Sequence, residues 1–152
     1  MDTCVLIEPW NGYYSMDRCS DYWDIIDELA RNDIVFCSKE VRREISKIDD
    51  DLWAWVKVRD YLFKDADDKV QENLRMILDR FQRLVDTTRD RSAADPWVIA
   101  HAIAEKAVVV TKESFAPKKM KIPDVCRSLS VECIDDHELI AELGIHFSAS
   151  LP

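Results

Sequence analysis

Residues 93–113 read AADPWVIAHAIAEKAVVVTKE, a pattern typical of a buried helix followed by a turn and a buried strand. Asp95 is a good N-cap residue, and Pro96 suits the first turn of the helix that would follow. Residues 97–104 are apolar except for one histidine, which indicates that little of this helix faces solvent. Residues 107–110 form a continuous apolar run, typical of a parallel strand covered on both faces. This stretch therefore predicts an α/β fold.

Shorter apolar runs predict further strands and helices of the same kind. Strands are expected at residues 34–37 and 131–134, and residues 1–7 predict a first strand or a very short strand running into a helix. Helices are expected at residues 20–31, from residue 38, from residue 122 and at residues 136–143. Residues 49–63 and 66–85 predict a helical hairpin inserted between sheet elements. We therefore expect a single domain over residues 1–152, with a parallel sheet of about four strands and helices on both faces.

The composition excludes several classes of protein. Only two of the 152 residues are glycine, which excludes a glycine-rich phosphate-binding loop. The net charge of -9 argues against broad electrostatic binding to nucleic acid, although a local basic patch remains compatible with it. The chain has neither an 18-residue apolar run nor a signal-peptide pattern, so we expect a soluble, cytoplasmic protein that does not bind membranes. The five cysteines lack any C-x-x-C spacing, which indicates free thiols rather than a zinc site.

Four acidic residues fall at or near the carboxyl ends of predicted strands, or at the start of the helices that follow. They are Asp2, Glu44, Asp95 and Glu113. In open α/β sheets, binding sites form outside the carboxyl ends of the strands. Glu44 also lies close to the apolar stripe of its helix, where an acid needs a partner. Hard carboxylate oxygens that converge in this way predict a site for Mg²⁺ or Mn²⁺.

Two other interpretations compete with a metal site. Cys37 and Arg43 have the C-x5-R spacing of a thiol phosphatase loop, but the segment has no glycine and contains Glu40, which would repel phosphate. Alternatively, the domain is only a binding module, whose helical hairpin and acidic surface serve a protein partner. The aromatic residues of the expected loop at residues 8–19 also allow two interpretations. They either stack on nucleotide bases or fill a compact loop.

Five segments of the chain resemble the PIN-domain ribonucleases, the VapC-like toxin superfamily, and more closely an uncharacterised PIN-like branch. They are DTCVLIE at residues 2–8 with the aromatic loop after it, VRREI at 41–45, ADPWVIA at 94–100, VVTKE at 109–113 and KIPDVC at 121–126. The resemblance covers nearly the whole chain. It implies a three-layer α/β/α sandwich and a metal-dependent endoribonuclease, the toxin of a toxin-antitoxin pair. The alternative is a catalytically weak or inert PIN-like protein-interaction module.

The resemblance also implies roles for individual residues. Asp2, Glu44, Asp95 and Glu113 match the acidic positions of the family, which are both catalytic and metal-binding, and Thr111 matches its strand-end hydroxyl residue. The chain departs from the family at Cys4, where a small polar residue is usual, and at Glu113, where Asp is usual. The basic residues expected to contact RNA phosphates are Arg42, Arg43, Arg89, Arg91, Lys118, Lys119 and Lys121.

The predicted hairpin is the expected site of a protein partner. It carries Trp53, Trp55, Phe63 and Phe81, and we expect some of this apolar surface to stay exposed. In similar toxins the corresponding helices take the helix of the antitoxin. An antitoxin, or a second copy of this chain in a homodimer, is therefore expected to cover the hairpin.

Overall fold

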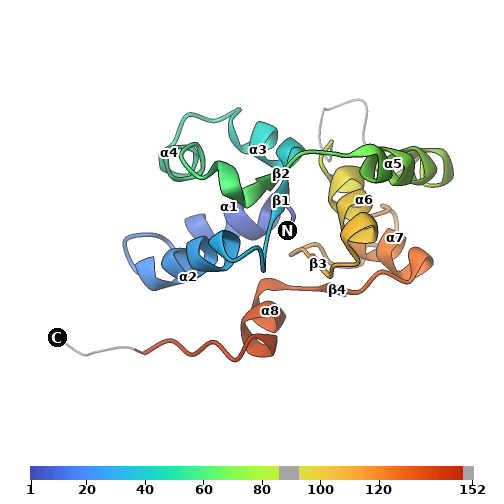
Figure 1. Ribbon diagram of the computed structural model, residues 1–152. Helices are drawn as coiled ribbons and strands as arrows, with labels where there is room; N and C mark the ends of the chain where they lie inside the picture. The colour runs from blue at the N-terminus through green and yellow to red at the C-terminus, as the bar shows by residue number, and fades with distance from the viewer. Residues whose placement is uncertain (86–92, 149–152) are drawn as a thin grey trace.

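A computed structural model describes residues 1–85 and 93–148, in which short parallel strands lie between helices (Figure 1). The helices of this part of the chain are α1 Cys4–Asn11, α2 Ser20–Arg31, α3 Lys39–Ile45, α4 Asp51–Val56, a 3-10 turn η1 Asp60–Leu62, α5 Asp68–Arg80, α6 Asp95–Glu105, α7 Ile122–Leu129 and α8 Asp136–Glu142. The strands are β1 Cys37–Ser38, β2 Phe63–Lys64, β3 Val109–Val110 and β4 Cys133–Ile134. This order and composition confirm a mixed α/β fold.

The strands of the described residues form two parallel pairs rather than one continuous sheet. β1 pairs with β2, with Cys37 opposite Phe63, and β3 pairs with β4, with Val109 opposite Cys133. The first two residues of the chain connect the pairs. The nitrogen of Met1 lies 2.6 Å from the carbonyl oxygen of Phe36, and the Asp2 amide donates to the Val110 carbonyl at 2.9 Å. The parallel pairing of residues 109–110 is therefore confirmed, and Asp2 lies directly beside it.

Several predicted helix ends are confirmed by the hydrogen bonds that cap them. Ser38 precedes α3 and accepts a hydrogen bond from the amide of Val41. Asp135 precedes α8 and accepts from the amide of Glu138, whose own side chain accepts from the Asp135 amide. α8 stops before Gly144, which has a φ of +64° that favours glycine. The ends of the helices follow from local chemistry that the sequence already displays.

The predicted helical hairpin is wrong. β2 lies between α4 and α5, so a strand separates the two expected helices. α4 packs against α3, whereas α5 packs against α6 on the other side of the molecule (Figure 1). The helix predicted over residues 49–63 includes Leu62 and Phe63, but these residues lie in η1 and β2. A short apolar run does not distinguish the two cases by itself.

The four aromatic residues of the predicted hairpin differ in how deeply they are buried. Phe63 and Phe81 are buried in the core. Trp53 and Trp55 are partly buried and pack against it. The antitoxin and homodimer thus stay predictions, and the hairpin surface that motivated them is not formed.

Three boundaries in the first half of the chain also differ from expectation. α1 begins at Cys4 and ends at Asn11, so part of the expected loop at residues 8–19 is helical. The expected strand at residues 34–37 begins only at Cys37, and Ile34 is exposed. The physical reason is that the strands are two residues long, which leaves too few residues for a periodic pattern.

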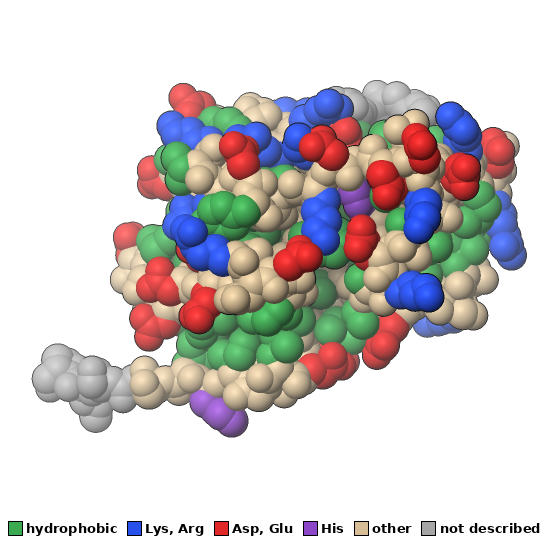
Figure 2. All heavy atoms as spheres, in the orientation of Figure 1, with side chains coloured by type: hydrophobic (Ala, Val, Ile, Leu, Met, Phe, Trp, Pro, Cys, Tyr) green, Lys and Arg blue, Asp and Glu red, His purple; other side chains and the backbone are tan. Residues whose placement is uncertain are grey.

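The core lies between the strands and the helices on both sides. Its largest fully buried side chains include Trp23 and Tyr22 of α2, Ile77 of α5, and Ile99 of α6. Acidic and basic side chains are interspersed over the face seen in Figure 2. Within residues 1–85 and 93–148, no helix is both long enough and apolar enough to cross a membrane.

Candidate functional site

The structure brings the four predicted acids together in one pocket of about 240 Å³. Asp2 precedes α1, Glu44 belongs to α3, Asp95 is the first residue of α6, and Glu113 follows β3. The remaining lining residues are Thr3, Cys4, Ile7 and Glu8. Segments from four separate parts of the chain therefore place carboxylates around one hollow.

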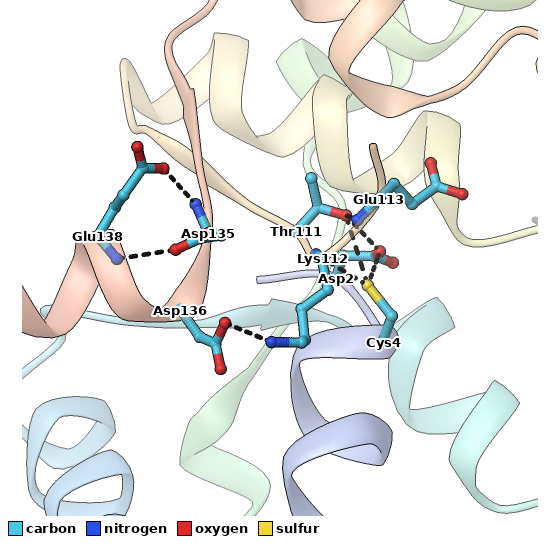
Figure 3. Close-up of polar contacts among 8 residues, drawn as sticks. All are labelled: Asp2, Cys4, Thr111, Lys112, Glu113, Asp135, Asp136 and Glu138. Atoms are coloured by element: carbon cyan, nitrogen blue, oxygen red, sulfur yellow. Dashed lines mark hydrogen bonds and ion pairs between the residues drawn. The ribbon is translucent and has the colours of Figure 1, made fainter. Parts of the chain in front are cut away.

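Asp2 is buried and is held by several donors around its carboxylate (Figure 3). Its Oδ1 accepts from the amide of Thr3 at 2.6 Å. Its Oδ2 accepts from the hydroxyl of Thr111 at 2.9 Å and from the thiol of Cys4 at 2.7 Å. Thr111, predicted as a supporting residue at the end of the strand, therefore contacts the predicted acid directly.

Glu44 has the partners that its position on a core-facing helix requires. The hydroxyl of Thr3 donates to its Oε2 at 2.5 Å, and the amide of Ala94 donates to its Oε1 at 3.1 Å. Both donors belong to segments distant in the sequence, so a hydrogen-bonded carboxylate joins α3 to the starts of α1 and α6. Without these bonds, partial burial of the acid would be costly.

Glu113 extends away from Asp2 (Figure 3) and is bound at its far end. Its Oε2 accepts from the amide of Ile122 at 3.0 Å, and Lys121 Nζ lies 3.8 Å from its Oε1. The amide of Glu113 in turn donates to the hydroxyl of Thr111 at 3.1 Å. The acid at the end of β3 is thus tied to the start of α7.

Three of the acids share one type of partner, the first amides of a helix. Asp2 accepts from the residue that precedes α1, Glu44 from the residue that precedes α6, and Glu113 from the first residue of α7. These amides have no partner within their own helix, and the helix dipole favours negative charge there. Helix N-termini therefore stabilise neighbouring carboxylates that would otherwise repel one another.

The predicted capping role of Asp95 is wrong by one residue. Ala94 occupies the N-cap position with helical backbone angles and no side-chain cap bond, and Asp95 is the first residue inside α6. Asp95 is buried and lines the acidic pocket. Pro96 follows it in the first turn, as expected.

Cys4 stands among the acids as a protonated thiol. Burial, followed by the charge of Asp2 and the hydrogen bond to it, raises the pKa of Cys4 far above its ordinary value. The thiol accordingly donates to Asp2, while its sulfur accepts from the amide of Lys112 at 3.2 Å. The thiol therefore connects the carboxylate of Asp2 to the backbone that follows β3.

Sequence reasoning missed an ion pair beside the site. Nζ of Lys112 lies 2.7 Å from Oδ1 of Asp136, which is almost completely buried (Figure 3). Burial lowers the pKa of Lys112, but the hydrogen bond and charge of Asp136 outweigh it and leave that pKa raised. Glu8 was also missed as a pocket residue. The helical start of α1 would have indicated it, because residues 4 and 8 share a helix face.

The basic residues predicted to contact RNA have different environments. Arg42 is held by contacts within the protein. It donates to the carbonyl of Lys57, pairs with Asp60 at 2.8 Å and lies over the ring of Trp53. Arg43 is exposed but pairs with Glu40 at 2.7 Å. Lys118 and Lys119 are exposed, and Lys121 lies near Glu113. Arg89 and Arg91 lie outside the described residues.

The thiol phosphatase interpretation of residues 37–43 conflicts with the structure. Cys37 is fully buried, and burial raises its pKa to about 11, so its thiol is protonated and out of reach of a substrate. Glu40 pairs with Arg43, the residue that would have to hold phosphate. A nucleophilic thiolate at Cys37 would need the opposite environment.

The donor set of the pocket fits a hard divalent cation in its chemistry, since carboxylate oxygens are the ligands that Mg²⁺ and Mn²⁺ prefer. In the conformation seen, no group of three or more His, Cys, Asp or Glu side chains among the described residues is arranged to hold one ion. The bonds to Thr3, Ala94 and Ile122 explain this, because they direct Glu44 and Glu113 toward backbone and hydroxyl donors. Shared ligation would require these two flexible side chains to turn.

Comparison with known proteins places the chain in a family. Residues 1–147 match the model of a family described as "Domain of unknown function (DUF4411)", and the chain belongs to that family. Neither the curated proteins nor the solved structures gave a match. The description of the family names no activity. The function is therefore inferred from the residues of the acidic pocket.

Proposed function

We propose that the protein is a metal-dependent endoribonuclease with a PIN-like α/β/α sandwich fold. The observation that carries the proposal is the pocket lined by Asp2, Glu44, Asp95 and Glu113. Parallel strand pairs with helices on both sides support the fold (Figure 1). The position of the acids beside the end of β3 supports the site, because α/β proteins bind ligands at such edges.

In this proposal the four carboxylates hold Mg²⁺ or Mn²⁺. The ion would supply charge to bind the scissile phosphate and would lower the pKa of a water molecule. Thr111 and Cys4 keep Asp2 in place through their hydrogen bonds to its Oδ2. Such donors to metal-binding carboxylates orient them and tune their affinity.

In this proposal one of the acids also acts as a general base in the hydrolysis. Glu44 or Asp95 would orient the attacking water and accept its proton. The water oxygen forms a bond to phosphorus, the bond from phosphorus to the 3′ oxygen breaks, and that oxygen takes up a proton. The products are a 5′-phosphate and a 3′-hydroxyl. Lys121, which lies 3.8 Å from Glu113, and the exposed Lys118 and Lys119 would contact the RNA backbone.

The test is cleavage of single-stranded RNA by purified protein. With Mg²⁺ or Mn²⁺ we expect cleavage that stops in EDTA, and Asp95→Asn should lower the rate at least about a hundredfold, because a metal-binding charge is lost. Gel analysis of labelled RNA, with end-group analysis of the products, measures both. Absence of cleavage under all these conditions would contradict the proposal and favour an inert interaction module.

A matched control variant distinguishes loss of the active site from misfolding and from contaminating nucleases. Asp68 is the first residue of α5, as Asp95 is of α6, but it is exposed and lies outside the acidic pocket. Asp68→Asn changes the same charge at the same helix position. It should retain full activity when purified in parallel.

A further inference from the structure

A second cleft lies at the far end of α1, and its cavity of about 540 Å³ has aromatic walls. Trp10 of α1 and Trp55 of α4 line it, with their ring centroids 6.3 Å apart. The lining comes from the last turn of α1, from α4 and from the segment between α1 and α2. We propose that this aromatic cleft, defined by Trp10 and Trp55, binds an unpaired nucleobase of the RNA substrate. The proposal rests on the ribonuclease function proposed above.

The acidic pocket and the aromatic cleft lie along one side of the same helix. Cys4, Ile7 and Glu8 line the acidic pocket, whereas Trp10 and Asn11 line the aromatic cleft. Positions three and four residues apart lie on the same helix face, and each residue advances about 1.5 Å. The centres of the two groups of lining residues are therefore about 6 Å apart along α1. A single strand that crosses the acidic pocket can reach the cleft with a neighbouring nucleotide.

Contacts within the protein hold the side chains of Trp10 and Trp55 in place. Trp10 packs edge-on against buried Trp23 at 4.7 Å, and Trp23 donates to the carbonyl of Tyr14 at 2.5 Å. The guanidinium of Arg59 stacks over Trp55 at 4.0 Å and is anchored to Asp27 at 2.6 Å. Walls held in this way lose little conformational entropy on binding, and aromatic faces bind bases by stacking.

The polar side chains of the cleft have unused hydrogen-bonding capacity. They are Asn11, Ser15, Asp17, Arg18 and Asp51. Within the described parts of the chain, no hydrogen bond or ion pair engages these side chains. In contrast, the carboxylates of Asp2, Glu44 and Glu113 in the acidic pocket are all bonded. The cleft therefore offers the donors and acceptors with which proteins read the edges of unstacked bases.

The charges of the cleft favour a base over a phosphate. Asp17 and Asp51 would repel an anion, but a carboxylate accepts hydrogen bonds from N–H groups through both of its oxygens. Guanine presents two adjacent N–H donors on its Watson–Crick edge, whereas uracil presents one. Guanine is therefore the base expected to bind best. Among the described residues of the lining, Arg18 is the one cation, and it is available for an adjacent phosphate.

Gly12 allows the chain to close behind the cleft. A Cβ at this position would lie 2.8 Å from the carbonyl oxygen of Glu8, closer than real contacts allow. The chain turns here directly from α1 into the segment that supplies Ser15, Asp17 and Arg18. The glycine thus permits the tight turn after α1 that places Ser15, Asp17 and Arg18 in the same cavity as Trp10 and Trp55.

Binding without cleavage tests the proposal. Fluorescence anisotropy in EDTA should compare labelled hexauridylate with the same hexamer carrying one guanine, for the wild type and for Trp55→Leu. We expect tighter binding of the guanine hexamer, and a loss of about ten- to a hundredfold in Trp55→Leu, because stacking on the indole is removed. Trp53→Leu, two residues away on α4 and outside the cleft, is the matched control and should bind as the wild type does.

A second variant keeps the test decisive if Trp55→Leu does not fold. Asp17 and Asp51 are exposed, so the double variant Asp17→Asn, Asp51→Asn should fold normally. It should lose the preference for guanine while binding hexauridylate at least as well, because two negative charges are gone. Three results would contradict base binding in the cleft. They are a wild type without preference for the guanine hexamer, a double variant that keeps this preference, and a folded Trp55→Leu variant that binds as tightly as the wild type. RNA cleavage that depends on Asp95 would still stand in each case.

Discussion

Thr111 ends β3 with its hydroxyl engaged on both sides. The hydroxyl donates to buried Asp2 at 2.9 Å and accepts from the amide of Glu113 at 3.1 Å. Thr111→Val keeps the shape but removes both bonds, so we expect the free energy of unfolding to fall by about 1–3 kcal/mol. Urea denaturation measures this. Thr111→Ser retains the hydroxyl and should recover most of the loss. Equal effects of Val and Ser would show that packing, rather than the hydrogen bonds, is responsible.

His101 provides a prediction about pH. It is buried on α6, and its Nδ1 has no hydrogen-bond partner among the described residues. Burial lowers the pKa of His101 below its ordinary value, and the neighbouring Glu105 opposes this only in part. The unfolded chain therefore takes up the proton first as the pH falls below about 6.5. The contribution of neutral His101 to stability is present above that pH and is lost as the pH falls through the folded-state pKa.

A variant isolates this contribution from the titration of the carboxylates. His101→Leu cannot bind a proton, so between pH 7.5 and 5.0 it should lose less stability than the wild type does. Urea midpoints at the two pH values give the comparison. His146→Leu, at an exposed position, should behave like the wild type. If His101→Leu and the wild type lose equal stability, burial of a neutral imidazole is not the cause.

β2 explains why the predicted helical hairpin does not form. Phe63 is buried and lies opposite Cys37 in the parallel pair. Phe63→Ala should lower the free energy of unfolding by about 3–5 kcal/mol, because it leaves a cavity under a strand. Val58 is exposed beyond α4, and Val58→Ala should change the stability by less than about 0.5 kcal/mol. A small effect at Phe63 would mean that the strand pair is not packed as described.

The converging helix starts are a second feature of the elements. α1, α6 and α7 each present their first amides to an acid of the pocket. The sequence predicted the helices that begin near residues 95 and 122, but it did not indicate that these starts point at carboxylates from other segments. That relation depends on how the helices pack around β3, which no local pattern encodes.

The proposed metal site links cation binding to the stability of the whole fold. A cation that binds only the folded chain raises the melting temperature, and at 100 times its Kd it adds about 2.7 kcal/mol. Mn²⁺ should therefore raise the Tm of the wild type, measured by differential scanning fluorimetry. The double variant Asp2→Asn, Glu44→Gln should lose the shift, whereas Asp68→Asn should keep it. A shift that survives in the double variant would place the metal elsewhere.

Local chemistry accounts for the features that could be predicted before the structure was known. The sequence predicted the α/β class, the helices that begin near residues 38 and 136, the helix end near residue 143, and a parallel strand within residues 107–110. It also singled out Asp2, Glu44, Asp95 and Glu113, because acids near strand ends are a recognisable pattern. Each of these patterns can be recognised within a few neighbouring residues.

Other features depend on contacts between segments that are distant in the sequence. Strands of two residues are too short to show a period, so only their partners reveal that residues 63–64 form β2 and that residues 1–2 join the two pairs. The donors that hold Asp2 and Glu44 come from segments up to about a hundred residues away, as with Thr111 and Ala94. Burial and hydrogen-bond partners are properties of the packed chain, and they convert four separate acids into one pocket.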